Sequence, residues 1–197
     1  YMAVDFFFML SGFVISYAYD DRWNKMSMGD FFKRRLVRLH PMIVMGAIIG
    51  LTTFLLGGGV KWDGSVTPMS GVALAFFLTC PFIPAWPGAA HEVRGNGEMF
   101  PLNGPSWSLF FEYIGNICYA LFIRRLSTKA LSVLVAVLGL IYIWFAVGNV
   151  SGYESVGGGW TFGDSVNIFG GFLRMMFPFS LGMLLARNFK PVRVRGI

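Results

Sequence analysis

Five long apolar runs constrain this chain more than any other feature of its sequence. Each has close to the roughly 20 residues that an α-helix needs to cross the hydrocarbon core of a bilayer. Of the 197 residues, 55% are hydrophobic and 13% charged, which is more apolar surface than a soluble domain of this size can bury. We predict an all-α, polytopic transmembrane helix bundle that forms a single domain over residues 1–197. The predicted spans are 3–19, 41–57, 106–123, 130–149 and 166–186.

A sixth apolar run, from Gly71 to Cys80, is shorter and is followed by Pro81, Pro84 and Pro87. Its length permits either a full span or a short or re-entrant segment. The positions of the basic residues distinguish these alternatives, because cytoplasmic loops of membrane proteins are enriched in Lys and Arg.

If the sixth run does not cross, the basic residues fall almost entirely on one side of the membrane. Six Lys or Arg lie in 20–40, three in 124–129 and four in 187–197, whereas 57–105 holds two and 150–165 none. If the run crosses, this bias disappears. We therefore predict that 71–84 does not fully cross, that 57–105 is a long extracytoplasmic loop, and that 20–40 is cytoplasmic.

The segment 27–41 predicts a short amphipathic helix at the cytoplasmic surface. Ser27 can cap its start, with Asp30 at capping-box spacing, and Pro41 is expected to force His40 out of helical geometry. At 100° per residue, one face carries apolar side chains that we expect to face lipid, and another carries arginines. The lipid-facing set is Phe32, Leu36 and Leu39, and the basic set is Arg34, Arg35 and Arg38.

The basic face has two interpretations. Arg side chains bind phosphate through two parallel hydrogen bonds, so Arg34, Arg35 and Arg38 suit the phosphates of an acyl-CoA donor in the cytoplasm. The alternative is contact with anionic lipid headgroups. The overall charge of +6 is assigned to topology, and we expect no nucleic-acid partner.

Two carboxylates lie within predicted spans, where ionisable groups must be paired or hydrated. Asp5 shares a helical face with Gly12 and Ser16 and is either a catalytic group or a cap near the outer interface. Glu112 lies about two helical turns inside its span. It is a candidate general base, a ligand of a sugar hydroxyl, or a structural partner of an arginine such as Arg174.

Other polar residues receive weaker assignments. Ser108 shares a helical face with Glu112, whereas Trp107 points elsewhere. His40 is interpreted as a stacking or interface residue, and Cys80 and Cys118 as packing residues. No metal-ligand spacing and no nucleotide-binding or serine-hydrolase motif is present, so we predict no metal site and no tightly bound cofactor.

Three ordered segments resemble the acyltransferase-3 family of bacterial membrane O-acyltransferases. They are Val4-Asp-Phe-Phe-Phe-Met-Leu-Ser-Gly-Phe13, Phe31-Phe-Lys-Arg-Arg-Leu-Val-Arg-Leu-His-Pro41 and Asn103-Gly-Pro-Ser-Trp-Ser-Leu-Phe-Phe-Glu112. The last span, from Arg174 to Gly182, is similar to that family too.

The resemblance implies transfer of an acyl group, expected to be acetyl, from cytoplasmic acyl-CoA. The acceptor would be a hydroxyl of an extracytoplasmic glycan, such as lipopolysaccharide or exopolysaccharide, and the location a bacterial inner membrane. By position, Arg35 and Arg38 correspond to the Arg-x-x-Arg motif of the family, and Trp107 and Glu112 to its Trp-Ser-Leu motif and following acid. Trp107, Ser108 and Arg174 are assigned to the acceptor or to structural support.

The resemblance also implies a catalytic histidine in a helix ahead of Tyr1. We therefore expect this sequence to be a piece of a longer protein that lacks segments at both ends and is inactive by itself. The alternative hypothesis is a non-enzymatic transport or scaffold subunit of polysaccharide export, motivated by glycine-rich spans and by the charges at Asp5, Glu112 and Arg174. That hypothesis predicts inverted repeats, and none is found in this sequence.

Overall fold

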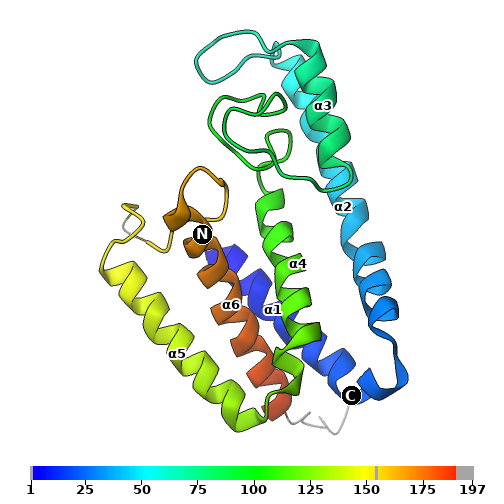
Figure 1. The fold of residues 1–197 in the computed structure, drawn as a ribbon, viewed down its shortest axis with the longest axis vertical. Coiled ribbons are helices and arrows are strands. Elements are labelled where there is room, and N and C mark those ends of the chain that lie inside the picture. The colour runs from blue at the N-terminus through cyan, green and yellow to red at the C-terminus, as the bar shows by residue number, and fades with distance from the viewer. Residues whose placement is uncertain (1, 154, 190–197) are drawn as a thin grey trace, which may run out of the picture.

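A computed structural model describes residues 2–153 and 155–189 as a bundle of long helices (Figure 1). The described residues contain no strand, and Val60 and Val66 form an isolated β-bridge. The predicted all-α helix bundle is confirmed. In chain order the elements are α1 Met2–Tyr19, η1 Asp20–Lys25, α2 Met28–Leu56, α3 Met69–Thr79, α4 Ser106–Leu121, η2 Ile123–Arg125, α5 Thr128–Val147 and α6 Ser165–Asn188.

Four of the described helical segments are long and apolar enough to cross a membrane. They correspond to α1 with η1, α2, α5 and α6. The remaining predicted span, 106–123, corresponds to α4, which has 16 residues, or about 24 Å at 1.5 Å per residue. The chain is therefore a multi-pass membrane protein, and its short α4 is the helix that carries Glu112.

The centre of the bundle is the pair formed by α1 and α6, which pack against each other more extensively than any other pair of described elements. Gly12 of α1 and Gly182 of α6 allow the two backbones to approach closely. Small residues at such positions are typical of helices that associate in lipid, because packing rather than water exclusion drives their association. Phe8, Phe111 and Phe179 fill the core between α1, α4 and α6.

α2 is one continuous helix, so the predicted separate amphipathic helix is wrong. The capping box of Ser27 and Asp30 is confirmed as its start, but the helix continues through His40 and Pro41. Proline is tolerated within membrane helices because neighbouring groups and small local adjustments compensate for the lost hydrogen bond. A single buried stripe joins the two halves, and its members are Phe31, Arg35, Leu39, Ile43 and Ala47.

Burial also corrects one expectation about side-chain direction. Leu39 is buried rather than facing lipid, whereas Leu36 is exposed as predicted. In the first span, Phe8 is fully buried and Phe6 is exposed. The aromatic side chains of α1 therefore point both into the bundle and away from it.

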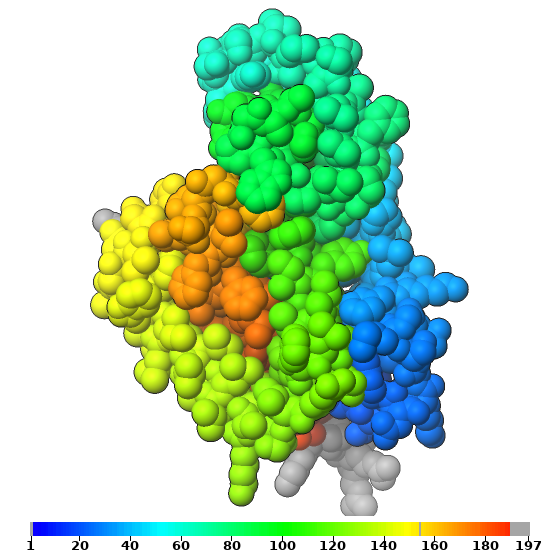
Figure 2. Space-filling view, viewed as in Figure 1, coloured from blue at the N-terminus to red at the C-terminus, as the bar shows by residue number. Residues whose placement is uncertain are grey.

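The sixth apolar run forms α3, which has only 11 residues. At about 16 Å it is too short to span a hydrocarbon core of about 30 Å, as expected for a short segment. Figure 1 shows α3 beside the C-terminal half of α2, with the connection 80–105 folded next to it. This part of the molecule projects beyond α5 and α6 in the space-filling view (Figure 2).

The helix connections lie at two opposite ends of the bundle (Figure 1). The short turns 20–27 and 122–127 are at one end, which we call the basic end. The connections 57–105 and 148–164 are at the other, which we call the loop end. This arrangement is the one that the charge distribution predicted.

Candidate active site

The most buried of the ion pairs in the described part of the chain joins α2 to α4. Nη2 of Arg35 lies 2.6 Å from Oε1 of Glu112, and the two side chains are 2% and 3% exposed. Ser11 of α1 donates its hydroxyl to the same oxygen at 2.6 Å, and Nη2 of Arg35 is 3.4 Å from Oγ of Ser11. Three helices thus converge on one carboxylate oxygen. Pairing compensates for part of the cost of placing charge away from water.

The same cluster contains polar atoms with unused hydrogen-bonding capacity. Within residues 2–153 and 155–189, Nε of Arg35, Oε2 of Glu112 and the hydroxyl of Tyr113 are buried and have no hydrogen-bond partner. Buried polar atoms are normally paired, because an unpaired one costs free energy. The ion pair therefore retains one donor and one acceptor that have no partner among the described residues.

A second ion pair lies closer to the loop end. Nε of Arg174 in α6 is 3.1 Å from Oδ1 of Asp5 in α1, with side chains 2% and 25% exposed. The Arg174 guanidinium also lies over the ring of Trp107, 5.1 Å from its centroid. This geometry is a cation–π contact. Trp107 and Glu112 thus have different partners, as their helical offset predicted.

A cavity of about 430 Å³ opens beside this second pair. Its wall combines two indole rings with one acidic and one basic side chain. The lining residues are Val4, Glu98, Gly104, Pro105, Trp107, Trp160 and Arg174. Aromatic faces with a few polar groups are usual in small-molecule sites.

At the basic end, Asp20 joins three helices in an arrangement that the sequence did not reveal. Its carboxylate accepts hydrogen bonds from Ser16 Oγ at 2.7 Å, Tyr119 Oη at 2.8 Å and Arg187 Nε at 2.9 Å. Arg187 also donates to the carbonyl oxygen of Leu126 at 2.7 Å. Asp20 therefore connects the ends of α1, α4 and α6 away from the Arg35–Glu112 pair.

The three arginines predicted to act together do not share one environment. Arg35 points into the bundle, whereas Arg34 and Arg38 are exposed near the basic end. The prediction that all three project together at the surface is therefore wrong for Arg35, which pairs with Glu112 of α4 inside the bundle. Donor binding by these residues stays a prediction.

One other site prediction is wrong. Glu112 does not pair with Arg174, because each has a different partner. Ser108 donates its hydroxyl to the carbonyl oxygen of Pro105 at 2.9 Å. The catalytic roles of Glu112 and Asp5 stay predictions, as does the interface role of the half-buried His40.

Ser11 is the residue of this site that the sequence interpretation missed. Its signal was a pair of small residues, Ser11 and Gly12, in a segment otherwise rich in Phe. Among the described residues, no group of three or more His, Cys, Asp or Glu could hold a metal ion.

Comparison with known proteins gives the class of this chain. It matches the family described as "Acyltransferase domain" over residues 1–197. The chain belongs to this acyltransferase family, as its three ordered segments predicted. It is therefore assigned to the enzymes that transfer acyl groups other than aminoacyl groups, which favours an enzyme over a transport or scaffold subunit.

Two curated proteins are similar to it. One is "Protein 2 in picA locus" of Rhizobium radiobacter, 33% identical over 149 residues, which are 72% of this chain and 75% of that protein. The other is "Acyltransferase MdmB" of Streptomyces mycarofaciens, 30% identical over 129 residues, or 62% of this chain and 28% of that protein. The chain thus spans less than a third of the second relative. No solved structure matches it.

Proposed function

We propose that the protein carrying this chain is a membrane O-acyltransferase of a bacterial inner membrane. It transfers an acyl group, acetyl in the simplest case, from cytoplasmic acyl-CoA to a hydroxyl of an extracytoplasmic glycan or related acceptor. The observation that carries the proposal is the buried pair of Arg35 and Glu112, because it keeps one unused donor and one unused acceptor between helices of an acyltransferase-family bundle.

The reaction requires both a hydrogen-bond donor and a hydrogen-bond acceptor. The acceptor oxygen bonds to the thioester carbonyl carbon, the carbon–sulfur bond breaks, and CoA leaves as a thiol with the proton of the hydroxyl. Nε of Arg35 can donate to the carbonyl oxygen, where negative charge develops in the transition state. Oε2 of Glu112 can accept a hydrogen bond from the attacking hydroxyl. The family resemblance assigns proton removal to a histidine outside this sequence.

The basic end supplies the donor side of the proposal. Arg34 and Arg38 are exposed there, on the same helix as Arg35. Guanidinium groups in this position can bind the phosphates of CoA, while the thioester reaches toward the buried pair.

The loop end supplies the acceptor side. Asp5, Arg174 and Trp107 lie together, and the cavity beside them is lined by a second indole, Trp160. This combination of an aromatic surface with charged hydrogen-bonding groups suits a sugar. Ser108 lies outside this set and is assigned to support of the helix start.

Labelled acetyl-CoA tests the donor assignment. Inside-out membrane vesicles containing the full gene product should incorporate labelled acetyl into the glycan fraction above the level of vector-control vesicles. A charge-assisted hydrogen bond contributes about 1.5–3 kcal/mol, so Arg34→Gln or Arg38→Gln should raise KM for acetyl-CoA about tenfold or more.

Lys33→Gln is the matched control, because Lys33 is an exposed cation next to Arg34. Its KM should stay within about twofold of the parent, or about 0.4 kcal/mol. Equal KM values in all three variants would remove the donor assignment, and absence of transfer at normal protein levels would contradict the proposed activity itself.

A further inference from the structure

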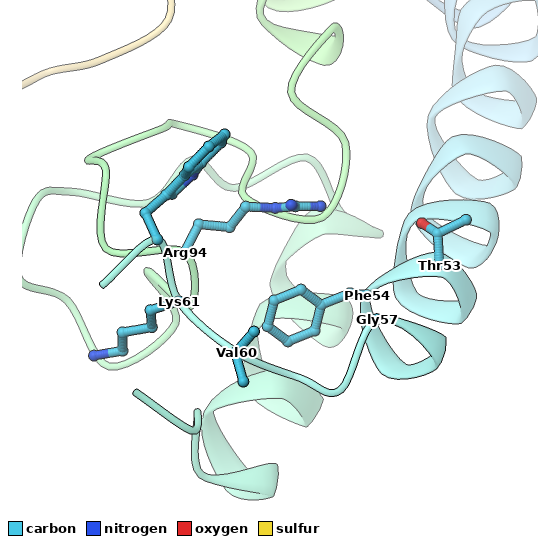
Figure 3. A pocket seen from close by; sticks show the side chains of 7 residues that line it. Thr53, Phe54, Gly57, Val60, Lys61 and Arg94 are labelled. Atoms are coloured by element: carbon cyan, nitrogen blue, oxygen red, sulfur yellow. The ribbon is translucent and has the colours of Figure 1, made fainter. Parts of the chain in front are cut away.

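A pocket of about 430 Å³ at the loop end, which shares no lining residue with the Trp107 cavity, is formed where the end of α2 meets the outer connection (Figure 3). We call it the Arg94 pocket. Its lining residues are Thr53, Phe54, Gly57, Val60, Lys61, Trp62 and Arg94. Its volume lies within the range of about 300–1,000 Å³ that is usual for small-molecule sites.

The Arg94 pocket has two cationic residues and no acidic residue in its lining. Nε of Arg94 donates to the carbonyl oxygen of Pro101 at 2.6 Å, and its guanidinium lies 5.3 Å from the centroid of the Phe54 ring. The two terminal nitrogens of Arg94 make no hydrogen bond with described residues. Arg94 is therefore held in place and still has donors to offer.

Asp63, an acidic residue that interacts electrostatically with Lys61, is occupied by other hydrogen bonds. Asp63 accepts hydrogen bonds from the backbone nitrogen and the hydroxyl of Ser65, at 2.9 and 2.6 Å. These bonds, with a smaller contribution from Lys61, lower the pKa of Asp63 below its usual value. Asp63 can offset the charge of Lys61 in part, but Arg94 has no acidic partner within hydrogen-bonding distance among the described residues.

An aromatic face lies beside the cations. Trp62 is 73% exposed, and its backbone nitrogen donates to the carbonyl oxygen of Arg94 at 3.0 Å. This bond holds the two walls of the pocket together. A large exposed indole that is fixed next to an arginine can stack on the apolar face of a sugar ring while the arginine binds an anionic substituent.

The Arg94 pocket lies beyond the level reached by the other spans. α2 and α5 both begin at the basic end (Figure 1), and α2 has 29 residues whereas α5 has 20. The difference corresponds to about 13 Å along the helix axis. α5 is already long enough to cross the hydrocarbon core. Thr53 and Gly57 therefore lie at the outer margin of the hydrocarbon core or outside it, where a hydrophilic ligand has access.

The pocket is also connected to the chain that enters the active site. Pro101, which accepts the Arg94 hydrogen bond, begins the turn that leads through Leu102 and Asn103 into α4. Leu102 and Asn103 lie against Gly50 and Gly46 of α2. A ligand that binds Arg94 therefore lies over the segment that positions α4.

From these contacts we infer that the Arg94 pocket binds an acidic sugar residue of the acceptor glycan. Arg94 binds its anionic group and Trp62 stacks on its ring, while Lys61, whose side chain points away from the Arg94 guanidinium (Figure 3), adds positive charge to the site. This inference rests on the proposed acyl transfer to a glycan and narrows the acceptor to one that carries negative charge.

Saccharide binding tests the inference without any donor. The full gene product is placed in lipid discs of phosphatidylcholine and titrated by calorimetry with trigalacturonate and, as the neutral counterpart, maltotriose. Trigalacturonate should bind, with an affinity that falls as salt is added, and maltotriose should bind at least tenfold more weakly. Equal affinity for the two saccharides, or no binding of trigalacturonate, overturns the inference.

Variants locate the binding. Arg94→Gln should weaken trigalacturonate binding at least tenfold. Lys61→Gln and Trp62→Ala should each weaken it at least threefold, and these two exposed or half-buried positions keep the test valid if Arg94→Gln does not fold. Lys129→Gln, an exposed cation at the basic end, is the matched control and should bind like the parent. Unchanged affinity in all three pocket variants overturns the inference.

Two further measurements distinguish saccharide binding from lipid headgroup binding, and the inference from the proposed activity. Discs that contain phosphatidylglycerol should leave trigalacturonate binding unchanged, and competition by this lipid would identify a headgroup site and overturn the inference. Transfer from labelled acetyl-CoA is measured on the same preparations. Retained saccharide binding without transfer counts against the proposed activity alone, and transfer without saccharide binding counts against the inference alone.

Discussion

Gly12 of α1 and Phe179 of α6 lie backbone against backbone, so closely that a β-carbon at position 12 would overlap the carbonyl group of Phe179. The relationship is repeated one turn along, where a β-carbon at Gly182 would overlap the carbonyl of Met9. The two glycines therefore set the separation of the helices that carry Asp5, Ser11 and Arg174.

Enlarging Gly12 should separate α1 from α6. Overpacking of a close contact costs about 1–3 kcal/mol or more, so Gly12→Leu should lower the thermal unfolding midpoint of the detergent-solubilised protein by several degrees and reduce its monodisperse fraction. Gly29→Ala is the control, since its β-carbon would approach only Oγ of Ser27, at 3.7 Å. A Gly12→Leu protein as stable as the control would contradict the close packing.

The pair of Arg35 and Glu112 should contribute both to stability and to acyl transfer, and single and double variants should separate the two contributions. Removing one partner of a buried pair leaves an uncompensated charge and costs about 3–5 kcal/mol. Arg35→Met alone and Glu112→Leu alone should therefore unfold at clearly lower temperature than the parent. The double variant should recover most of the lost stability, because no unpaired charge remains.

Transfer activity distinguishes the two roles of this pair. The stable double variant should incorporate no labelled acetyl, because it lacks both the donor at Nε of Arg35 and the acceptor at Oε2 of Glu112. If the double variant transferred acetyl at the parental rate, the pair would be structural only and the proposed site would be wrong.

Asp20 should contribute to stability much more than its neighbour Asp21. Asp20 accepts hydrogen bonds from Ser16, Tyr119 and Arg187, whereas Asp21 is exposed and makes none with the described residues. A hydrogen bond to a charged group contributes about 1.5–3 kcal/mol, so Asp20→Asn should lower the unfolding midpoint and Asp21→Asn should not. Equal midpoints would show that the Asp20 contacts contribute little.

The orientation of the bundle is tested with two single cysteines. In a background where Cys80 and Cys118 are replaced by Ala, Lys25→Cys places a thiol at the basic end and Val66→Cys places one at the loop end, where Val66 is 75% exposed. In spheroplasts, a membrane-impermeant maleimide should label position 66 directly and position 25 only after permeabilisation. The reverse pattern would invert the proposed topology and with it the side of donor binding.

Much of the architecture follows from hydropathy and charge. Spans such as 130–149 are continuous and apolar, and the structure has α5 at Thr128–Val147. Pro41 was misleading, because the usual helix-breaking effect assumes that the freed carbonyl group is exposed to competing water. In α2, buried side chains on both sides of Pro41, such as Leu39 and Ile43, hold one continuous helix.

The candidate site was predicted less well, and the reason is geometric. A carboxylate at Glu112 indicates that a partner is needed, but the identity of that partner depends on how each helix is rotated in the bundle. Arg174 and Arg35 were equally available from composition, and only the three-dimensional arrangement assigns Arg35 to Glu112. Asp20 was missed because two of its three partners, Tyr119 and Arg187, lie 99 and 167 residues away in the sequence.

Because α2 is one uninterrupted helix, a contact at one point sets the rotation of the whole helix about its own axis. A rotation by a single residue, about 100°, would carry Arg35 out of reach of Glu112 and would also move Gly46 and Gly50 away from Asn103 and Leu102. The ion pair between Arg35 and Glu112 near the basic end thus also fixes the rotational position of α2 at the loop end. Mutations at Arg35 are therefore expected to disturb the turn beneath the Arg94 pocket, even though no side chain connects the two places directly.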